Sequence, residues 1–100
     1  MTNVMKIEDI RSRLLERQSE LSRLSVSALR LFGSYARGDA RADSDIDLVV
    51  AFEKQANFDA FMDLKFLLEE AMGKPVDLVT EAAVRPQLKL RIEREAIRVA

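Results

Sequence analysis

The segment at 47–52, DLVVAF, constrains the fold more than any other part of the chain, because it is apolar at nearly every position. Strands with one face in water alternate apolar and polar residues, whereas a nearly continuous apolar run indicates a strand buried on both faces. Two further runs, ALRLF at 28–32 and VDLVT at 76–80, predict additional short strands. The chain should therefore build a sheet whose central strand is covered on both sides.

Three helices are predicted around these strands. Apolar residues recur at helical intervals among charges over 7–24, which predicts an amphipathic helix there. A wide apolar stripe over 57–72 predicts a second helix, ended by Gly73 and Pro75. The third has Pro86 in its first turn and runs to about Glu95, and the AIRVA sequence after it forms a short strand or a frayed tail. This order predicts an α/β (α+β) fold, a small mixed β-sheet covered by helices.

Composition narrows the classes of protein that fit. With 100 residues, 48% of them hydrophobic and 33% charged, we expect one globular domain over 1–100. A charged N-terminal segment and the lack of a long apolar run predict a cytoplasmic protein with no membrane span. The chain has no cysteine and no histidine, so any metal must be held by oxygen ligands. A net charge of -1 makes nucleic acid an unlikely partner.

A Gly-Ser pair follows directly on the first predicted strand. Gly33 and Ser34 open a short helical turn through Tyr35, Ala36 and Arg37. Free backbone N–H groups at such a turn attract phosphate, glycine permits close approach and a serine hydroxyl can bond to the anion. Alternatively, Ser34 only caps the helical turn and Gly33 only turns the chain.

Two aspartates stand at the head of the second strand. In an extended segment Asp45 and Asp47 project from one face, about 6 to 7 Å apart at their α-carbons, while the apolar residues between and after them face the other way. Asp77 repeats the arrangement in the third strand and joins them if the strands pair. Three carboxylates together repel unless a divalent cation neutralises them, and magnesium or manganese suits oxygen ligands. The alternative places Asp45 in a polar turn and Asp77 in an ion pair with an arginine.

These residues resemble a known signature. The stretch GSYARGDARADSDIDLVV, with ten residues between the Gly-Ser pair and the Asp-x-Asp pair, is similar to the polymerase-beta-type nucleotidyltransferases, and in particular to the minimal nucleotidyltransferases, or MNT proteins. VDLVT stands where that family has its third acidic strand, so the resemblance covers essentially the whole chain. One departure is the missing proline before the acidic pair, a position that does no chemistry.

The resemblance implies a polymerase-beta-like core and a reaction, the transfer of AMP from ATP to a hydroxyl with release of pyrophosphate. Gly33 and Ser34 would hold the β- and γ-phosphates. Asp45 and Asp47 would coordinate two ions of Mg²⁺ or Mn²⁺, and Asp77 would bind the catalytic ion and help to deprotonate the acceptor. Arg37 would steady the triphosphate, although an arginine near Asp39 and Asp43 is equally well explained as a surface ion pair.

The resemblance also implies a partner. Similar MNT proteins act beside a HEPN-domain ribonuclease toxin, as antitoxins that adenylylate a tyrosine of the toxin. A non-catalytic antitoxin that blocks its partner sterically and an adenylyltransferase for small molecules such as aminoglycosides are the alternatives. A chain of this length leaves no room for a second substrate-gripping domain, which favours an acceptor with its own binding surface.

Two surfaces are candidates for contacts with such partners. The helix at 57–72 has apolar residues around much of its circumference, and a surplus face could dock a helical partner or a second copy of the chain. The C-terminal segment has a basic flank that could meet an acidic partner or nucleotide phosphates, formed by Arg85, Lys89, Arg91, Arg94 and Arg98.

Overall fold

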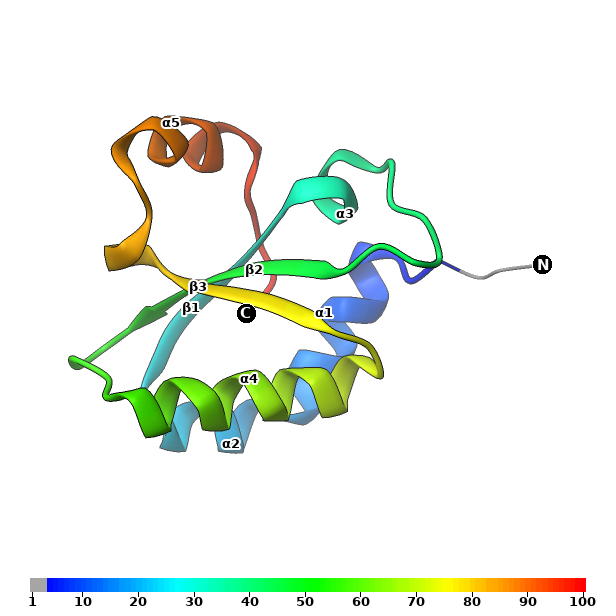
Figure 1. Ribbon diagram of the computed structural model, residues 1–100. Coiled ribbons are helices and arrows are strands. Elements are labelled where there is room, and N and C mark those ends of the chain that lie inside the picture. Colours follow the sequence, from blue (N-terminus) through cyan, green and yellow to red (C-terminus); the bar gives the residue numbers. More distant parts are fainter. Residues whose placement is uncertain (1–3) are drawn as a thin grey trace.

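A four-stranded mixed sheet forms the centre of the molecule in the computed structural model, which describes residues 4–100 (Figure 1). The order across the sheet is β3-β2-β1-β4. Strands β2 and β3 run parallel, whereas β1 is antiparallel to both of its neighbours, β2 and β4. The strands are β1 (Val26–Phe32), β2 (Ile46–Phe52), β3 (Val76–Thr80) and β4 (Ile97–Arg98).

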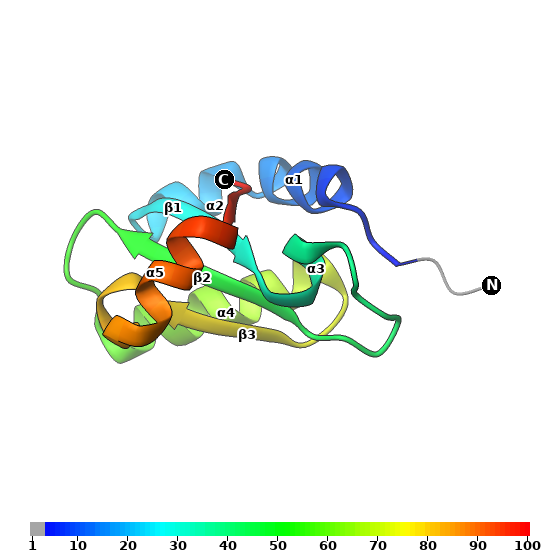
Figure 2. The same ribbon diagram turned by 90° about the horizontal axis from the view of Figure 1, so that it is seen from above.

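Helices cover the two faces of the sheet unequally. One face carries α1 (Ile7–Glu16), α2 (Gln18–Arg23) and α4 (Phe58–Met72), below the sheet in Figure 1. The other face carries the five-residue α3 (Gly33–Arg37) and, after the short 3₁₀ turn η1 (Glu81–Ala83), the helix α5 (Pro86–Glu95). Figure 2 shows α5 crossing above the strands on this second face. The sheet and its helices confirm the predicted fold class.

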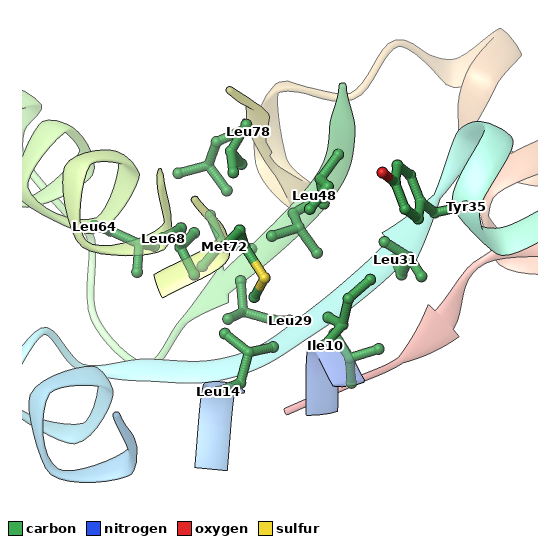
Figure 3. Close-up of a cluster of buried hydrophobic side chains, with 14 of the residues drawn as sticks. Ile10, Leu14, Leu29, Leu31, Tyr35, Leu48, Leu64, Leu68, Met72 and Leu78 are labelled. Carbon is green, nitrogen blue, oxygen red and sulfur yellow. The ribbon is translucent and has the colours of Figure 1, made fainter. Parts of the chain in front are cut away.

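The hydrophobic core lies between the sheet and the helices α1, α2 and α4 (Figure 3). Alternate residues of β2 point into it, since Ile46, Leu48 and Val50 are all fully buried. The strand residue between the first two, Asp47, faces the opposite side and is only half-buried. The side chains that α1, α2 and α4 contribute to this core are Ile10, Leu14, Leu21, Leu64, Leu68 and Met72.

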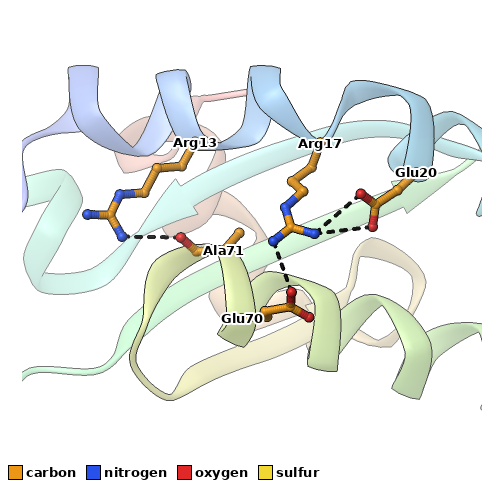
Figure 4. A network of polar contacts seen from close by, with 5 residues as sticks. All are labelled: Arg13, Arg17, Glu20, Glu70 and Ala71. Atoms are coloured by element: carbon orange, nitrogen blue, oxygen red, sulfur yellow. Dashed lines mark hydrogen bonds and ion pairs between the residues drawn. The ribbon is translucent and has the colours of Figure 1, made fainter.

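The single helix predicted over 7–24 is wrong, because the chain forms two helices that meet at Arg17 (φ -105°, ψ 16°). Leu14 and Leu21 are both buried, and one straight helix would turn Arg17 and Gln18, which lie between them, toward the sheet. With the break, both leucines stay in the core while Arg17 is only half-buried and Gln18 is exposed. It also lets the Arg17 guanidinium bond to Glu20 at 3.3 Å and to Glu70 of α4 at 3.1 Å (Figure 4).

Other element boundaries agree with the sequence prediction to within two residues. β3 and α5 have the expected bounds, whereas β1 begins two residues earlier than predicted and β2 one residue earlier. α4 begins one residue later, because Asn57 caps it by accepting a hydrogen bond from the Ala60 N–H at 2.8 Å. The AIRVA end supplies the short strand β4. None of the helices within 4–100 is both long and apolar enough to cross a membrane.

Neighbouring leucines of α1 allow a direct test of the packing. Leu14 is 1% exposed and Leu15 is 68% exposed. We expect Leu14→Ala to lower the free energy of unfolding by about 3 to 5 kcal/mol, because it leaves a cavity in the core. Leu15→Ala should change it by less than about 0.5 kcal/mol. Urea denaturation followed by circular dichroism measures both values, and equal losses for the two variants would contradict the orientation of α1.

Candidate functional site

The turn from β1 into α3 lies directly against the second strand. Phe32 pairs with Asp47 in the sheet, and Gly33 then adopts a left-handed conformation with φ of +71°. A methyl group added to Gly33 would collide with the Asp47 carboxylate. Glycine is therefore required at this position both by the backbone and by the closeness of the carboxylate.

Ser34 is half-buried at the start of α3. Its carbonyl accepts hydrogen bonds from the N–H groups of Gly38 and Asp39, both at 3.0 Å, which close the turn. The Ser34 hydroxyl makes no hydrogen bond to the described part of the chain, and no side chain caps α3. The alternative that Ser34 serves only as a helix cap is thus not what the structure shows.

Tyr35 anchors this turn to the rest of the molecule. Its ring is 5% exposed and belongs to the core, and its hydroxyl accepts a hydrogen bond of 2.6 Å from the Lys74 ammonium, just before β3. Gly38 ends the helix in the left-handed conformation, with φ of +83°. The position of Ser34 relative to the strands is therefore held from both sides.

Asp47 and Asp77 are neighbours across the parallel pair β2 and β3, where they share one register position. Both alternate with buried apolar residues, so their side chains emerge from the same face of the sheet. Asp77 is exposed and Asp47 is half-buried. The pairing of β2 with β3 therefore brings Asp77 to the site, as the sequence analysis required.

Burial and neighbouring charge raise the pKa of Asp47 to about 6. The largest cause is the partial removal of its carboxylate from water, followed by the charge of Asp77 and a hydrogen bond to that carboxylate; Asp45 adds a smaller repulsion. The Arg37 guanidinium opposes these effects and lowers the pKa. The positive charge of Arg37 therefore does not fully offset the effects of burial and of the neighbouring carboxylates on Asp47.

Asp45 stands further from this pair than the sequence prediction supposed. It is exposed, one residue before β2 begins, and its charge is the weakest of the carboxylate influences on Asp47. No three acidic side chains within 4–100 are gathered closely enough to hold one metal ion together. The structure therefore brings Asp47 and Asp77 together and leaves Asp45 at the margin, so the expected tight cluster of three is not formed.

Arg37 is placed both for a surface ion pair and for a contact with a ligand, the two roles that the sequence allowed. Its Nε lies 3.3 Å from a carboxylate oxygen of Asp39, and both side chains are largely exposed. The same arginine borders the cavity next to Gly33 and Asp77. An exposed ion pair of this kind contributes little to stability, so it leaves the guanidinium available to a ligand.

A cavity of about 400 Å³ opens beside the acidic pair, between the sheet and α5. Sequence reasoning had not singled out its apolar wall, which consists of Phe32, Val79, Val84, Leu88 and Ile92. The signal that was available is the character of α5, a helix with several apolar residues of which only Ile92 is buried. Two members of the basic flank, Arg85 and Arg91, also border this cavity.

Comparison with known proteins identifies the family of the chain. The family model for the nucleotidyltransferase domain matches residues 7–99. The protein adenylyltransferase MntA of Thermococcus cleftensis is 35% identical over 97 residues, which cover 96% of this chain and 98% of that protein. A solved structure with the provisional name of minimal nucleotidyltransferase superposes with a TM-score of 0.80 at 42% identity, covering 93% of this chain and 95% of the other.

A more distant match shows the fold alone. It is a complex of a tri-AMPylated Shewanella oneidensis HEPN toxin with an MNT antitoxin, with a TM-score of 0.58 and 21% identity over 88% of this chain and 71% of the other. The matched family model and the closely similar relatives settle the family. The chain belongs to the nucleotidyltransferase-domain family, among its minimal members, the group of the protein adenylyltransferase MntA.

Proposed function

We propose that this nucleotidyltransferase transfers AMP from ATP to a tyrosine hydroxyl of a HEPN-domain toxin and thereby acts as its antitoxin. The observation that carries the proposal is the register of β2 and β3, which sets Asp47 beside Asp77 within reach of the Gly33 turn. The relative from Thermococcus cleftensis is a protein adenylyltransferase, and a complex with the same fold holds an AMPylated HEPN toxin. A cytoplasmic location belongs to the same proposal, because the reaction consumes ATP.

A divalent metal ion, Mg²⁺ or Mn²⁺, fits the acidic pair. The donors at the site are carboxylate oxygens, which hard cations prefer, and burial together with the neighbouring charge of Asp77 raises the pKa of Asp47 more than the Arg37 guanidinium lowers it. We assign Asp47 and Asp77 as its ligands, whereas Asp45 lies at the margin of the site. When bound, such an ion neutralises charge on the carboxylates and on the triphosphate.

The residues of the chain have distinct roles in the proposed reaction. Gly33 allows the backbone to approach the triphosphate closely, and the free Ser34 hydroxyl donates a hydrogen bond to a β- or γ-phosphate oxygen. Arg37 supplies a positive charge at the same end of the site.

The transfer itself makes one bond and breaks one bond. The acceptor oxygen forms a bond to the α-phosphorus of ATP, and the bond between that phosphorus and the bridging oxygen to the β-phosphate breaks. Pyrophosphate leaves with the electron pair of the broken bond. The proton of the hydroxyl passes to the carboxylate of Asp77, which is exposed and thus open to an acceptor that approaches from solvent.

The two alternative functions make different demands on these residues. A sterically acting antitoxin has no need of the closely placed Asp47 and Asp77, which repel each other. An enzyme for small molecules would have to enclose its acceptor, whereas Asp77 lies exposed at the site. Both observations favour a macromolecular acceptor and a catalytic role.

The substitution Asp47→Asn should raise the stability of the protein while it abolishes the activity. Because the pKa of Asp47 is raised in the folded protein, the unfolded chain binds fewer protons between pH 4 and 6, and the folded protein loses stability as the pH rises through that range. The Asp47→Asn variant does not lose this stability, because its side chain amide does not ionise. In EDTA at pH 7.5 we expect it to be about 1 kcal/mol more stable than the original protein, a value reduced by solvent screening, yet inactive.

Thermal unfolding at pH 4 and pH 7.5 measures this difference. The stability advantage of Asp47→Asn should be present at pH 7.5 and nearly absent at pH 4. A variant that is less stable than the original protein at pH 7.5 would contradict the charge repulsion inferred for the pair.

Metal binding should follow the protonation of Asp47. A proton on this carboxylate competes with the cation, so the affinity for Mn²⁺ should be about tenfold lower at pH 5 than at pH 7. Electron paramagnetic resonance of free Mn²⁺ gives the dissociation constants. Asp43→Asn, an exposed carboxylate outside the pair, is the control and should bind Mn²⁺ as the original protein does. An affinity that does not depend on pH would count against Asp47 as a ligand.

Labelling of a partner tests the reaction directly. The protein is incubated with a purified HEPN-domain toxin, MgCl₂ and ATP labelled on the α-phosphate, and we expect label on a tyrosine of the toxin, located by mass spectrometry. Addition of EDTA and the Asp77→Asn substitution should each reduce labelling at least a hundredfold. Protection from the toxin that persists in both conditions would instead identify a sterically acting antitoxin.

A further inference from the structure

The strand that carries Asp77, β3, forms one edge of the sheet. The order across the sheet is β3-β2-β1-β4, so within residues 4–100 no strand lies beyond β3. Figure 2 shows β3 along one margin of the sheet. The backbone N–H and C=O groups on its outer side therefore face no partner strand. An open edge of this kind is a surface on which another chain can add a strand.

Alternate residues of β3 direct their backbone groups toward β2 and away from it. The parallel ladder begins with a hydrogen bond of 3.2 Å from the Ile46 N–H to the Pro75 carbonyl, so the odd-numbered residues of β3 bond to β2. The even-numbered residues point their backbone groups to the open side, and these are Val76, Leu78 and Thr80.

This open side is closed before Asp77 and free after it. The Val76 N–H donates a hydrogen bond of 3.1 Å to the Glu69 carboxylate of α4, so a side chain already occupies the first outward donor. In the described part of the chain no side chain bonds to the backbone N–H of Leu78 or of Thr80. A segment that pairs with β3 therefore finds its free backbone groups from Asp77 onward.

The order of the functional groups across the sheet places the acceptor at this same edge. The turn at Gly33 and Ser34 follows β1, Asp47 lies on β2 and Asp77 lies on β3. In the proposed reaction pyrophosphate leaves toward the turn, because its phosphates bind there. An in-line displacement puts the attacking oxygen on the opposite side of the α-phosphorus. The acceptor hydroxyl therefore comes from the side of β3.

We propose that the acceptor protein presents its tyrosine on an extended segment that pairs with the open edge of β3. The proposal rests on the proposed function and names the form in which the acceptor is recognised. Neighbouring strands lie about 4.7 to 4.9 Å apart, and residues opposite each other project from the same face of the sheet. A tyrosine opposite Asp77 thus stands beside the carboxylate that takes the proton of its hydroxyl.

Charge favours an acceptor segment over a second copy of the chain at this edge. Asp47 and Asp77 already face each other across β2 and β3. Two copies paired through their β3 strands would set two such acidic pairs on adjacent strands, and the added carboxylates would increase the repulsion. The tyrosine of an acceptor segment is neutral and adds no repulsion.

Proline at position 80 tests the pairing. Thr80 has φ of -84° and ψ of 147°, which are close to the angles of proline, so Thr80→Pro removes an outward N–H and keeps the strand. Loss of this hydrogen bond, with the ring in the way of the incoming carbonyl, should raise the KM for a purified HEPN-domain toxin about tenfold. The KM for ATP and the kcat should not change. Labelling with ATP that carries label on the α-phosphate measures all three values.

The matched control is Thr80→Val. Both variants lose the hydroxyl that accepts a hydrogen bond from the Ala83 N–H, but only the proline removes the backbone donor. Thr80→Val should therefore bind the toxin as the original protein does, and circular dichroism checks that both variants are folded.

Amide hydrogen exchange, followed by NMR, tests the same edge without a substitution. In the free protein the N–H groups of Leu78 and Thr80 should exchange faster than that of Val79, which bonds to β2. The toxin is added with MgCl₂ and α,β-methylene ATP, which cannot release AMP. It should slow the exchange of Leu78 and Thr80 about tenfold and leave Val79 unchanged.

Several outcomes would overturn the proposal. An unchanged KM for the toxin in Thr80→Pro would do so, and so would unslowed exchange of Leu78 and Thr80 in the complex. Equal rises in KM for Thr80→Pro and Thr80→Val would assign the effect to the lost hydroxyl instead. Exchange that slows with protein concentration and needs no toxin would identify a second copy as the occupant. If the original protein transfers no label to the toxin, the proposed function itself fails.

Discussion

Asp47 and Asp77 are held side by side because β2 and β3 run parallel with these two residues in register. Each is flanked in its strand by apolar residues that belong to the core, so a shift of one position would expose those residues and bury the carboxylates. Packing on the face that carries α1, α2 and α4 therefore fixes the positions of the two carboxylates on the opposite face. Burial of the apolar residues beside Asp47 and Asp77 therefore keeps the two carboxylates together although they repel each other.

The two faces of the sheet have different roles, one in stability and the other at the candidate site. α1, α2 and α4 cover one face and bury the large aliphatic side chains that stabilise the fold (Figure 3). The other face carries the short α3, the exposed α5 and the acidic pair, and it contains unbalanced charge and open space. The ion pairs of Arg17 lie on the first side (Figure 4), where they join α1 and α2 to α4 without entering the site.

Much of this architecture could be predicted from local patterns, and the errors occur where distant residues decide. The strands, α5 and the common face of the aspartates followed from hydrophobic spacing. The break at Arg17 did not, because it depends on how this part of the chain packs against the sheet and α4, where Arg17 contacts Glu70, 53 positions away. The sequence equally could not show that Asp45 stays outside the close pair, that Gly33 touches Asp47, or that α5 stands clear of the sheet. Those features arise from tertiary packing alone.

The sparse packing of α5 has a consequence for how proteins of this architecture diversify. Most of its side chains can be exchanged without creating a void in the core, since the helix buries one residue. Mutations there would be tolerated by the fold while they reshape the wall nearest the reacting groups. Evolution could thus alter which substrate is accepted without re-optimising the scaffold, and an engineer seeking new selectivity would randomise this helix first.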